Sequence, residues 1–287
     1  MISNYISLIR VKQWTKNLIV FSGLIFSENL FHPLQLEKSI AAFILFCFLS
    51  SSVYVINDIC DLENDRQHPI KKQRPLPAGL ISLKSAILFA LCLDIFVFVS
   101  AYYLNAVFFK ICVIYFVTFV TYSLFLKNVV ILDVLIISCG FVMRAIAGAV
   151  VIEVRYSPWF MVCTFLLSLF LALAKRRHEI VLLNENATAH RKILEEYSTY
   201  FLDQMISVVT PSTIIAYTIY TLSPDAISPN LEYTVPFVVY GIFRYLYLVH
   251  QKGRGGRPEL ILLTDIPLLF NVMIWAALCV YIIYFLD

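Results

Sequence analysis

The segment 57–79 (NDICDLENDRQHPIKKQRPLPAG) gathers residues that could do chemistry between two long apolar runs. Four carboxylates come first and four fixed cations follow: Asp58, Asp61, Glu63 and Asp65, then Arg66, Lys71, Lys72 and Arg74. If the preceding helix continues through this segment, Asn57, Asp61 and Asp65 lie one turn apart on one face. The spacing therefore predicts a polar face, with Asp58 beside it, at the end of a membrane-depth helix.

This arrangement favours a bound divalent cation. Carboxylates one turn apart on a helix repel each other by about 0.2–0.5 kcal/mol per pair, so an isolated helix gains nothing from them. A divalent cation removes the repulsion, and Mg²⁺ typically binds one or two carboxylates together with substrate phosphate oxygens. The basic half of the segment would then hold the rest of an anionic substrate. The alternative is a solvated loop whose charges only set the membrane topology.

The composition is that of a polytopic membrane protein. Of the 287 residues, 60% are hydrophobic and 14% are charged, and the mean hydropathy is +0.81. Soluble domains carry roughly 25% charged residues, so an ordinary soluble fold is excluded. The apolar runs are continuous rather than alternating, which excludes the strands of a membrane barrel. We expect an all-α fold in which residues 1–287 form a single transmembrane catalytic domain.

The apolar runs predict nine transmembrane helices, at about 17–31, 39–56, 82–104, 107–126, 129–152, 159–174, 205–222, 235–249 and 266–286. On this topology most Lys and Arg residues fall on the side of the N-terminus, and only Lys38, Lys110 and Arg155 lie on the other side. The positive-inside rule then places the N-terminus and a substrate cavity on the cytoplasmic face of the cytoplasmic membrane. The charged connection 175–203 is expected to form an amphipathic helix over the mouth of the bundle.

Arg144 is an ionisable residue within the fifth expected span. Such residues are costly in a bilayer and usually functional, so we expect Arg144 to pair with an anion. That anion could be Asp133, Asp58 or a ligand. Arg244, by contrast, is expected to extend from late in its span to the cytoplasmic surface.

Three further basic segments accompany the acidic one: residues 10–17 (RVKQWTKN), 174–179 (AKRRHE) and 253–258 (GRGGRP). The first could be a membrane anchor with an interfacial Trp, and the second could be topology-setting charge. The glycines of the third permit close approach of the backbone to an anion, although a flexible turn explains them equally well. None of the three identifies a site by itself.

Residues 57–65, with Arg66, resemble the NDxxDxxxD signature of the UbiA superfamily of intramembrane prenyltransferases. The nine-helix topology of that superfamily agrees with the expected spans. Ordinary members carry a second acidic motif, DxxxD, after the sixth helix, where this chain has the cationic 175–179 (KRRHE). That departure resembles the decaprenyl-phosphate phosphoribosyltransferase branch, as do residues 11–17, 68–75 and 253–259 and the set Tyr122, Lys127, Asp133 and Arg144.

The resemblance implies transfer of 5-phosphoribose from 5-phosphoribosyl diphosphate (PRPP) to a polyprenyl phosphate of the decaprenyl type. The lipid phosphate would attack C1 of the sugar and pyrophosphate would leave, with no covalent nucleophile from the protein. PRPP carries phosphate at both ends, which suits one acidic and several basic clusters. Catalysis would depend on a metal and cations that stabilise the leaving pyrophosphate, and on alignment of two mutually repelling anions.

The resemblance and the residue types together suggest roles. Asp58, Asp61 and Asp65 are expected to hold Mg²⁺, with Mn²⁺ as the alternative, and Asn57 to orient the metal or bind the diphosphate. Candidates for the sugar-donor phosphates are Arg66, Lys71, Arg74, Lys175 and Arg176. Candidates for the lipid phosphate or the diphosphate are Lys16, Lys127 and Arg144, with Asn17 and Tyr122 as further substrate-binding residues. The catalytic candidates are the three aspartates and Arg144.

Three other functions stay open at this point. A prenyltransferase that moves a prenyl group from its diphosphate to an aromatic or other small acceptor would share the fold and the first motif. A transporter or lipid flippase would show polar groups near the middle of the bilayer, whereas here they gather at one end. A purely structural role in the membrane would not explain the acidic cluster. The expected partners are PRPP, a polyprenyl phosphate and the membrane, with no nucleic acid; a homo-oligomer stays open.

Overall fold

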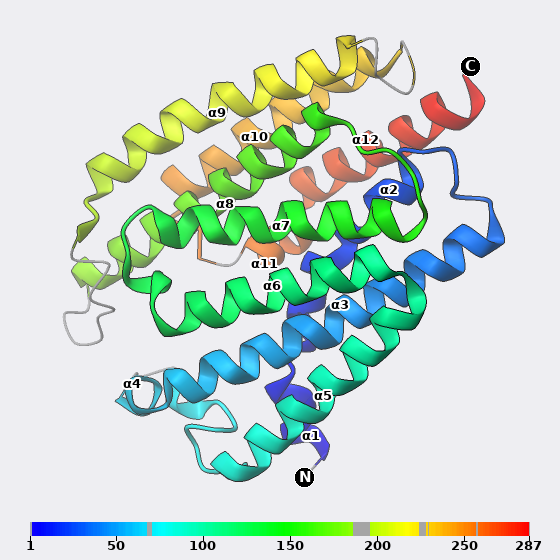
Figure 1. Cartoon of the computed structure of the whole chain (residues 1–287). Helices are drawn as coiled ribbons and strands as arrows, with labels where there is room; N and C mark the ends of the chain where they lie inside the picture. Colours follow the sequence, from blue (N-terminus) through cyan, green and yellow to red (C-terminus); the bar gives the residue numbers. More distant parts are fainter. Residues whose placement is uncertain are drawn as a thin grey trace.

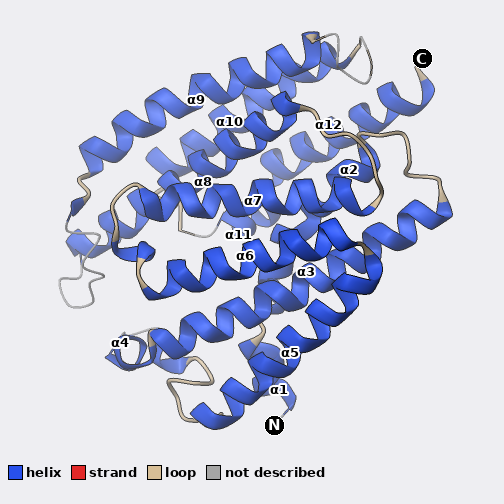
Figure 2. Cartoon of the chain, viewed as in Figure 1, coloured by secondary structure: helices blue, strands red, loops and turns tan. Residues whose placement is uncertain are grey.

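The computed structural model describes residues 2–67, 71–185, 196–223, 228, 230–256 and 258–286. Within these ranges the chain is helical and contains no strand (Figure 1, Figure 2). The elements are, in chain order, α1 (Ile2–Leu8), η1 (Val11–Phe21), α2 (Ser22–Ile25), α3 (Pro33–Cys60), α4 (Leu62–Gln67), η2 (Lys71–Gln73), α5 (Leu83–Leu104), α6 (Ala106–Leu124), η3 (Leu126–Asn128), α7 (Leu132–Val151), α8 (Pro158–Glu185), α9 (Thr199–Leu222), η5 (Leu231–Thr234), α10 (Val235–His250), α11 (Pro258–Thr264) and α12 (Ile266–Phe285). The expected all-α fold is confirmed.

Seven of the described helices are long and apolar enough to cross a membrane: α3, α5, α6, α7, α8, α9 and α12. They coincide with seven of the nine expected spans, and the protein is an integral membrane protein. The other two expected spans contain shorter elements. The 3₁₀ helix η1 and the four-residue α2 occupy the first, and the 16-residue α10 occupies the eighth. The count of nine is therefore not confirmed.

The irregular N-terminal segment lies directly on α7 because two glycines allow it. A Cβ added to Gly148 of α7 would lie 1.9 Å from the carbonyl oxygen of Val20, and one added to Gly23 would lie 2.8 Å from the Cα of Ala149. Any larger side chain at either position would separate the two backbones. This close contact places η1 against the middle of the bundle.

Helix α3 is longer than the membrane core and carries the acidic segment out of it. Its 28 residues span about 42 Å, whereas the hydrocarbon core of a bilayer is about 30 Å thick. It begins with Pro33 at its first turn, where the missing N–H costs nothing. The helix contacts η1 as well as α5 and α6 (Figure 1), and Val53, Val55 and Asp58 in its final turns are buried.

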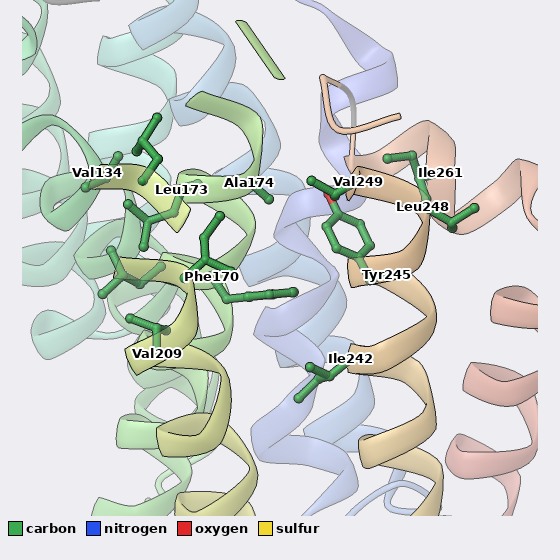
Figure 3. Packing of buried hydrophobic residues seen from close by; sticks show 14 of the residues in the cluster. Val134, Phe170, Leu173, Ala174, Val209, Ile242, Tyr245, Leu248, Val249 and Ile261 are labelled. Atoms are coloured by element: carbon green, nitrogen blue, oxygen red, sulfur yellow. The ribbon is translucent and has the colours of Figure 1, made fainter. Parts of the chain in front are cut away.

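The second half of the chain packs around one apolar cluster drawn from α7, α8, α9 and α10. Figure 3 shows Phe170 of α8 beside Tyr245 of α10, and Val134 of α7 and Val209 of α9 belong to the same cluster. The rings of Phe170 and Tyr245 meet edge to face with their centroids 5.5 Å apart. This packing fixes the end of α8 from which Lys175 and Arg176 project.

The separate amphipathic helix expected at 175–203 is not formed as predicted. Residues up to Glu185 continue α8 without a break. Residues 186–195 lie outside the described ranges. After them, Ser198 caps α9 by accepting a 3.0 Å hydrogen bond from the Phe201 N–H.

The bundle has two ends that differ in character. We call the end that carries α4 and η3 the acidic end (Figure 1). The opposite end carries α2 and the loop 152–157 between α7 and α8 (Figure 1). Helix α7 connects the two ends over about 30 Å, since its 20 residues rise about 1.5 Å each.

Candidate active site

The three aspartates of the acidic segment are buried at the acidic end of the bundle. The exposed fractions of the whole residues are 1% for Asp58, 8% for Asp61 and 2% for Asp65. The predicted single helix through this segment is interrupted: α3 ends at Cys60, and Asp61 (φ −95°, ψ 6°) links it to α4. Helix-like hydrogen bonds persist across the break, from Asp61 N to Asn57 O at 2.9 Å and from Asp65 N to Asp61 O at 2.8 Å. The carboxylates therefore stay close together, as the spacing predicted.

Arg74 connects two of these carboxylates. Its Nη1 donates to Asp58 Oδ1 at 3.0 Å and to Asp65 Oδ2 at 2.7 Å. Lys71 Nζ lies 3.5 Å from the other oxygen of Asp65. Burial lowers the pKa of Arg74 and nearby Arg10 adds to this, whereas the two carboxylates oppose it. Lys71 and Arg74 thus join the acidic cluster, as expected from the sequence.

Arg10 is a member of the cluster that the sequence analysis did not select individually. Its guanidinium pairs with Asp58 and lies over the ring of Tyr54, 5.0 Å from the centroid. Arg10 has a left-handed backbone conformation (φ 53°) at the junction between α1 and η1. The general basic character of residues 10–17 was the only signal in the sequence, because the pairing joins positions 48 residues apart.

Lys127 brings the turn between α6 and α7 to the acidic cluster. Its Nζ lies 2.5 Å from Asp61 Oδ1, while Asn57 Nδ2 donates to Asp61 Oδ2 at 3.1 Å. Tyr122, one turn earlier on α6, is half-buried and its ring packs against Phe119. Lys127 and Asn57 are therefore at the predicted site.

Two predicted phosphate ligands are placed elsewhere. Arg66 is about half exposed and pairs with Glu63 at 2.9 Å, because it follows Asp65 on α4 and faces away from the cluster. Arg176 is buried and donates to Asp133 at 2.8 Å and to Glu179 at 2.6 Å. Tyr197 completes that network by donating to the other oxygen of Asp133 at 2.8 Å. Arg66 and Arg176 are thus held by Glu63, and by Asp133 and Glu179, and not by the aspartates of the acidic cluster; their role as phosphate ligands stays a prediction.

Arg144 is buried among neutral partners. Its Nε donates to Asn17 Oδ1 at 2.7 Å, its Nη1 to Gly140 O at 2.9 Å and its Nη2 to Tyr115 Oη at 2.5 Å. Among the described residues no carboxylate forms an ion pair with it. The expected pairing with Asp133 or Asp58 is wrong, because those carboxylates are already bound by Arg176 and by Arg10 and Arg74. Arg144 instead joins η1 to α6 and α7.

A second charged group lies where η1, α8 and α11 meet. The charges of Lys16 and Lys175 are close enough to interact with each other and with Glu259. Gln13 donates a 2.9 Å hydrogen bond to Glu259. Burial acts to raise the pKa of Glu259, but Lys16, Gln13 and Lys175 outweigh it and hold that pKa below its usual range. Glu259 was not selected from the sequence, since a single carboxylate in a glycine-rich connection gives no signal of its own.

These two groups occur on a fold with known relatives. The sequence matches the UbiA prenyltransferase family across residues 18–266. The chain belongs to the UbiA prenyltransferase family. It is 30% identical to the decaprenyl-phosphate phosphoribosyltransferase of Mycolicibacterium smegmatis, over 99% of this chain and 94% of that protein. It is also 30% identical to the protein of that name from Corynebacterium glutamicum, over 98% of this chain and 87% of that protein.

A solved UbiA homologue has the same fold. The structure of a UbiA homologue from Archaeoglobus fulgidus bound to GPP and Mg²⁺ superimposes with a TM-score of 0.75, covering 98% of this chain and 99% of that one. The sequence identity is 17%, so the likeness concerns the fold. The superfamily resemblance seen in residues 57–66 is thus confirmed.

Gly255 and Gly256 serve a packing role in this UbiA protein, whereas Gly253 has a left-handed backbone (φ 60°). A Cβ on Gly256 would lie 2.5 Å from the His178 ring, and one on Gly255 would lie 2.9 Å from the His178 Cβ. The loop therefore lies directly on α8, beside Lys175 and Arg176. Close approach to His178 explains these glycines without an anion; Arg257 lies outside the described residues.

The donor chemistry of the acidic segment fits a hard divalent cation, although the site is not preformed. Carboxylate oxygens and the Asn57 amide are ligand types that Mg²⁺ accepts. Among the described residues, however, no three His, Cys, Asp or Glu side chains are arranged as a metal site. Each aspartate is instead paired with Arg or Lys side chains. Metal binding to this chain requires those cations to turn away from the carboxylates.

Proposed function

We propose that this UbiA protein transfers 5-phosphoribose from PRPP to a polyprenyl phosphate in the membrane and releases pyrophosphate. The observation that carries the proposal is the pairing of the buried aspartates with Arg10, Arg74 and Lys127, together with a second cationic group at Lys16 and Lys175. PRPP needs cationic partners at both of its ends. The names of the full-length relatives support the same reaction.

The aspartates hold the metal in this proposal. Asp58, Asp61 and Asp65 bind Mg²⁺, or Mn²⁺ in its place, and Asn57 orients Asp61 through the hydrogen bond between them. The bound metal neutralises charge on the departing pyrophosphate. With the aspartates holding a metal, Arg74 and Lys127 would no longer be needed as their partners and could bind phosphate oxygens. One set of cations thus stabilises the empty site and then the substrate.

The two cationic groups divide the phosphates of PRPP between them. Arg10, Lys71, Arg74 and Lys127 lie at the aspartates and bind the diphosphate end. Lys16 and Lys175 lie at the meeting of η1, α8 and α11 and bind the phosphate at the other end or that of the lipid. Lys175 is exposed, which suits a residue that receives a ligand. Its position corresponds to the missing second acidic motif, where a diphosphate–metal site would need carboxylates.

Arg144 acts as a positioning residue in this scheme. Its three hydrogen bonds go to the protein, and one of them holds Asn17, the residue next to Lys16. Asn17 is fully buried and also donates to Ser50 of α3 at 3.1 Å. Arg144 therefore sets the position of η1 and, through it, of Lys16. Asn17 has the same supporting role, whereas Tyr122 lies near Arg176.

The acidic end faces the cytoplasm of the cell in this proposal, and the protein resides in the cytoplasmic membrane. The excess of Lys and Arg on that side supports this orientation. PRPP is water-soluble and enters from the cytoplasm, while the polyprenyl phosphate approaches from the bilayer. A phosphate monoester is mostly dianionic at neutral pH, so the attacking lipid oxygen needs no strong base from the protein.

One assay distinguishes the proposed phosphoribose transfer from the related transfer of a prenyl group. Purified protein in lipid nanodiscs would be incubated with Mg²⁺, a polyprenyl phosphate and PRPP labelled in the ribose, and in parallel with a labelled prenyl diphosphate and an aromatic acceptor. We expect label to enter the lipid only in the first reaction, with pyrophosphate released in equal amount. Prenyl transfer to the acceptor without ribose transfer would overturn the proposal.

A further inference from the structure

The end of the bundle opposite to the aspartates contains a pocket of about 340 Å³. It lies between α2, α7, α8, α9 and the loop 152–157, and its lining includes Ser22, Ala149, Arg155, Ser157, Phe160 and Tyr220. Its volume falls at the lower end of the range of about 300–1,000 Å³ that is typical of small-molecule sites. It is separated from the acidic end by the length of α7, so the proposed reaction does not use it.

Two hydroxyl groups at this pocket have no hydrogen-bond partner. The Oγ atoms of Ser22 and Ser157 are both inaccessible to solvent and unpaired in the described structure. Ser22 is 7% exposed as a residue. Serines in helices commonly satisfy the hydroxyl with the carbonyl four residues earlier, as Ser138 and Ser168 do here. Buried hydroxyl groups rarely stay unpaired. Both Oγ atoms are closed to solvent here, so each side chain must rotate about its Cα–Cβ bond to donate to an acceptor in the pocket.

Arg155 adds an uncompensated positive charge to the same pocket. It is exposed, and among the described residues it makes no ion pair or hydrogen bond. The nearest carboxylate in sequence, Glu153, lies 3.9 Å from Lys38 instead. Two hydroxyl donors and a guanidinium form a donor set suited to an anion.

The rest of the pocket is apolar and aromatic. Phe160 lies between Phe26 and Tyr220, with ring centroids 5.4 and 6.1 Å away. The wall on α7 consists of small residues, including Ala145 and Ala149, which leave the space open. An inorganic anion would leave this apolar wall uncovered, whereas a molecule with an anionic head and an apolar chain would cover both parts.

We propose that this pocket binds the phosphate group of a lipid from the leaflet at that end of the bundle. The phosphate accepts hydrogen bonds from Ser22 and Ser157 and pairs with Arg155, and the first part of the lipid chain lies against Phe26, Phe160 and Tyr220. The lipid is a phospholipid with a net negative charge or a polyprenyl phosphate, since both present this chemistry. The inference is independent of the proposed transfer reaction.

Native mass spectrometry of the full-length protein, released from detergent, tests the site. The probes are phosphatidylglycerol, a polyprenyl phosphate, the zwitterionic phosphatidylcholine and inorganic phosphate. The variants are Arg155→Gln and Ser22→Ala. The matched control is Lys110→Gln, because Lys110 is an exposed cation at the same end that does not line the pocket.

We expect wild type and Lys110→Gln to retain one tightly bound anionic lipid. Arg155→Gln should weaken its binding by about tenfold or more, and Ser22→Ala by a smaller factor, since hydrogen bonds to charged groups are the strong ones. The probe retained best identifies the source of the phosphate. Equal binding by Arg155→Gln and Lys110→Gln would overturn the proposal, as would equal retention of phosphatidylcholine or displacement of the lipid by inorganic phosphate. Unchanged melting temperatures without added lipid show that the variants are folded.

Discussion

Lys127 and Asp61 are joined by an ion pair of 2.5 Å although 66 residues separate them in the chain. The contact connects the end of α3 to the turn between α6 and α7, so it links the acidic segment to the helix that carries Arg144. Both side chains are largely buried, with 12% and 11% exposed. In the proposed reaction, a metal bound to Asp61 would compete with this lysine for the carboxylate.

The first prediction concerns Asp61. Asp61→Asn removes a metal-binding charge and leaves Lys127 without its partner, so we expect ribose transfer to fall by at least about 100-fold. Membrane insertion should be retained. The matched control is Glu63→Gln, because Glu63 belongs to the same acidic segment but is exposed and pairs with Arg66 at the surface. Initial rates of label transfer into lipid measure both variants. Activity near wild type in Asp61→Asn would refute the metal assignment.

The second prediction is that Arg74→Gln changes the affinities for the metal and for PRPP in opposite directions. Arg74→Gln removes the cation that lies between Asp58 and Asp65, so Mn²⁺ should bind more tightly in the absence of PRPP. The affinity for PRPP should fall by about tenfold or more, because a charge-assisted bond to phosphate is lost. Electron paramagnetic resonance titration of Mn²⁺ and calorimetry with PRPP measure the two affinities separately. Arg66→Gln, the same change at an exposed neighbouring position, should alter neither.

Weaker Mn²⁺ binding by Arg74→Gln would show that the guanidinium supports the metal site instead of competing with the metal. Similar losses in Arg74→Gln and Arg66→Gln would show that only the total charge of the segment matters.

Local spacing predicted part of this site well. Asn57, Asp58, Asp61 and Asp65 lie within three helical turns, so their common location follows from helix geometry alone. The approximate positions of seven long helices also followed from continuous apolar runs. Both signals depend on neighbours in the sequence, and they remained valid even though the helix breaks at Asp61.

Long-range pairing could not be predicted in the same way. Arg10, Lys127 and Arg176 are all cations near carboxylates, but only the packing of the bundle decides which carboxylate each one meets. Arg176 was expected at a phosphate and instead pairs with Asp133, 43 residues away. The position of the 3₁₀ helix η1 could not be predicted locally either, because its close contact with α7 depends on Gly148 in a distant segment.

Arg144 should matter for stability even without substrate. Arg144→Met leaves Asn17 and Tyr115 without their partner, and each unsatisfied buried group costs about 1–3 kcal/mol. We expect a lower melting temperature of the purified protein without PRPP. Tyr115→Phe, which removes one of the three hydrogen bonds, should lower it less. An unchanged melting temperature with loss of activity would instead show that Arg144 binds substrate.

The last prediction concerns the pH dependence of stability at Glu259. The pKa of its carboxyl group is held below the usual 4.5, with Lys16, Gln13 and Lys175 outweighing burial. A lowered folded-state pKa means that the charged form stabilises the fold. Its contribution should be fully present above about pH 4.5 and lost as the pH falls through the folded-state pKa.

The comparison of wild type with Glu259→Gln measures that contribution. The difference in melting temperature should be constant between about pH 5.5 and 7.5 and shrink below about pH 4.5, as the wild-type carboxylate becomes protonated. Glu63→Gln serves as the control, because Glu63 is exposed and should contribute little at any pH. A difference that grows as the pH falls would show that the positive charges of Lys16 and Lys175 do not hold Glu259 in its charged form.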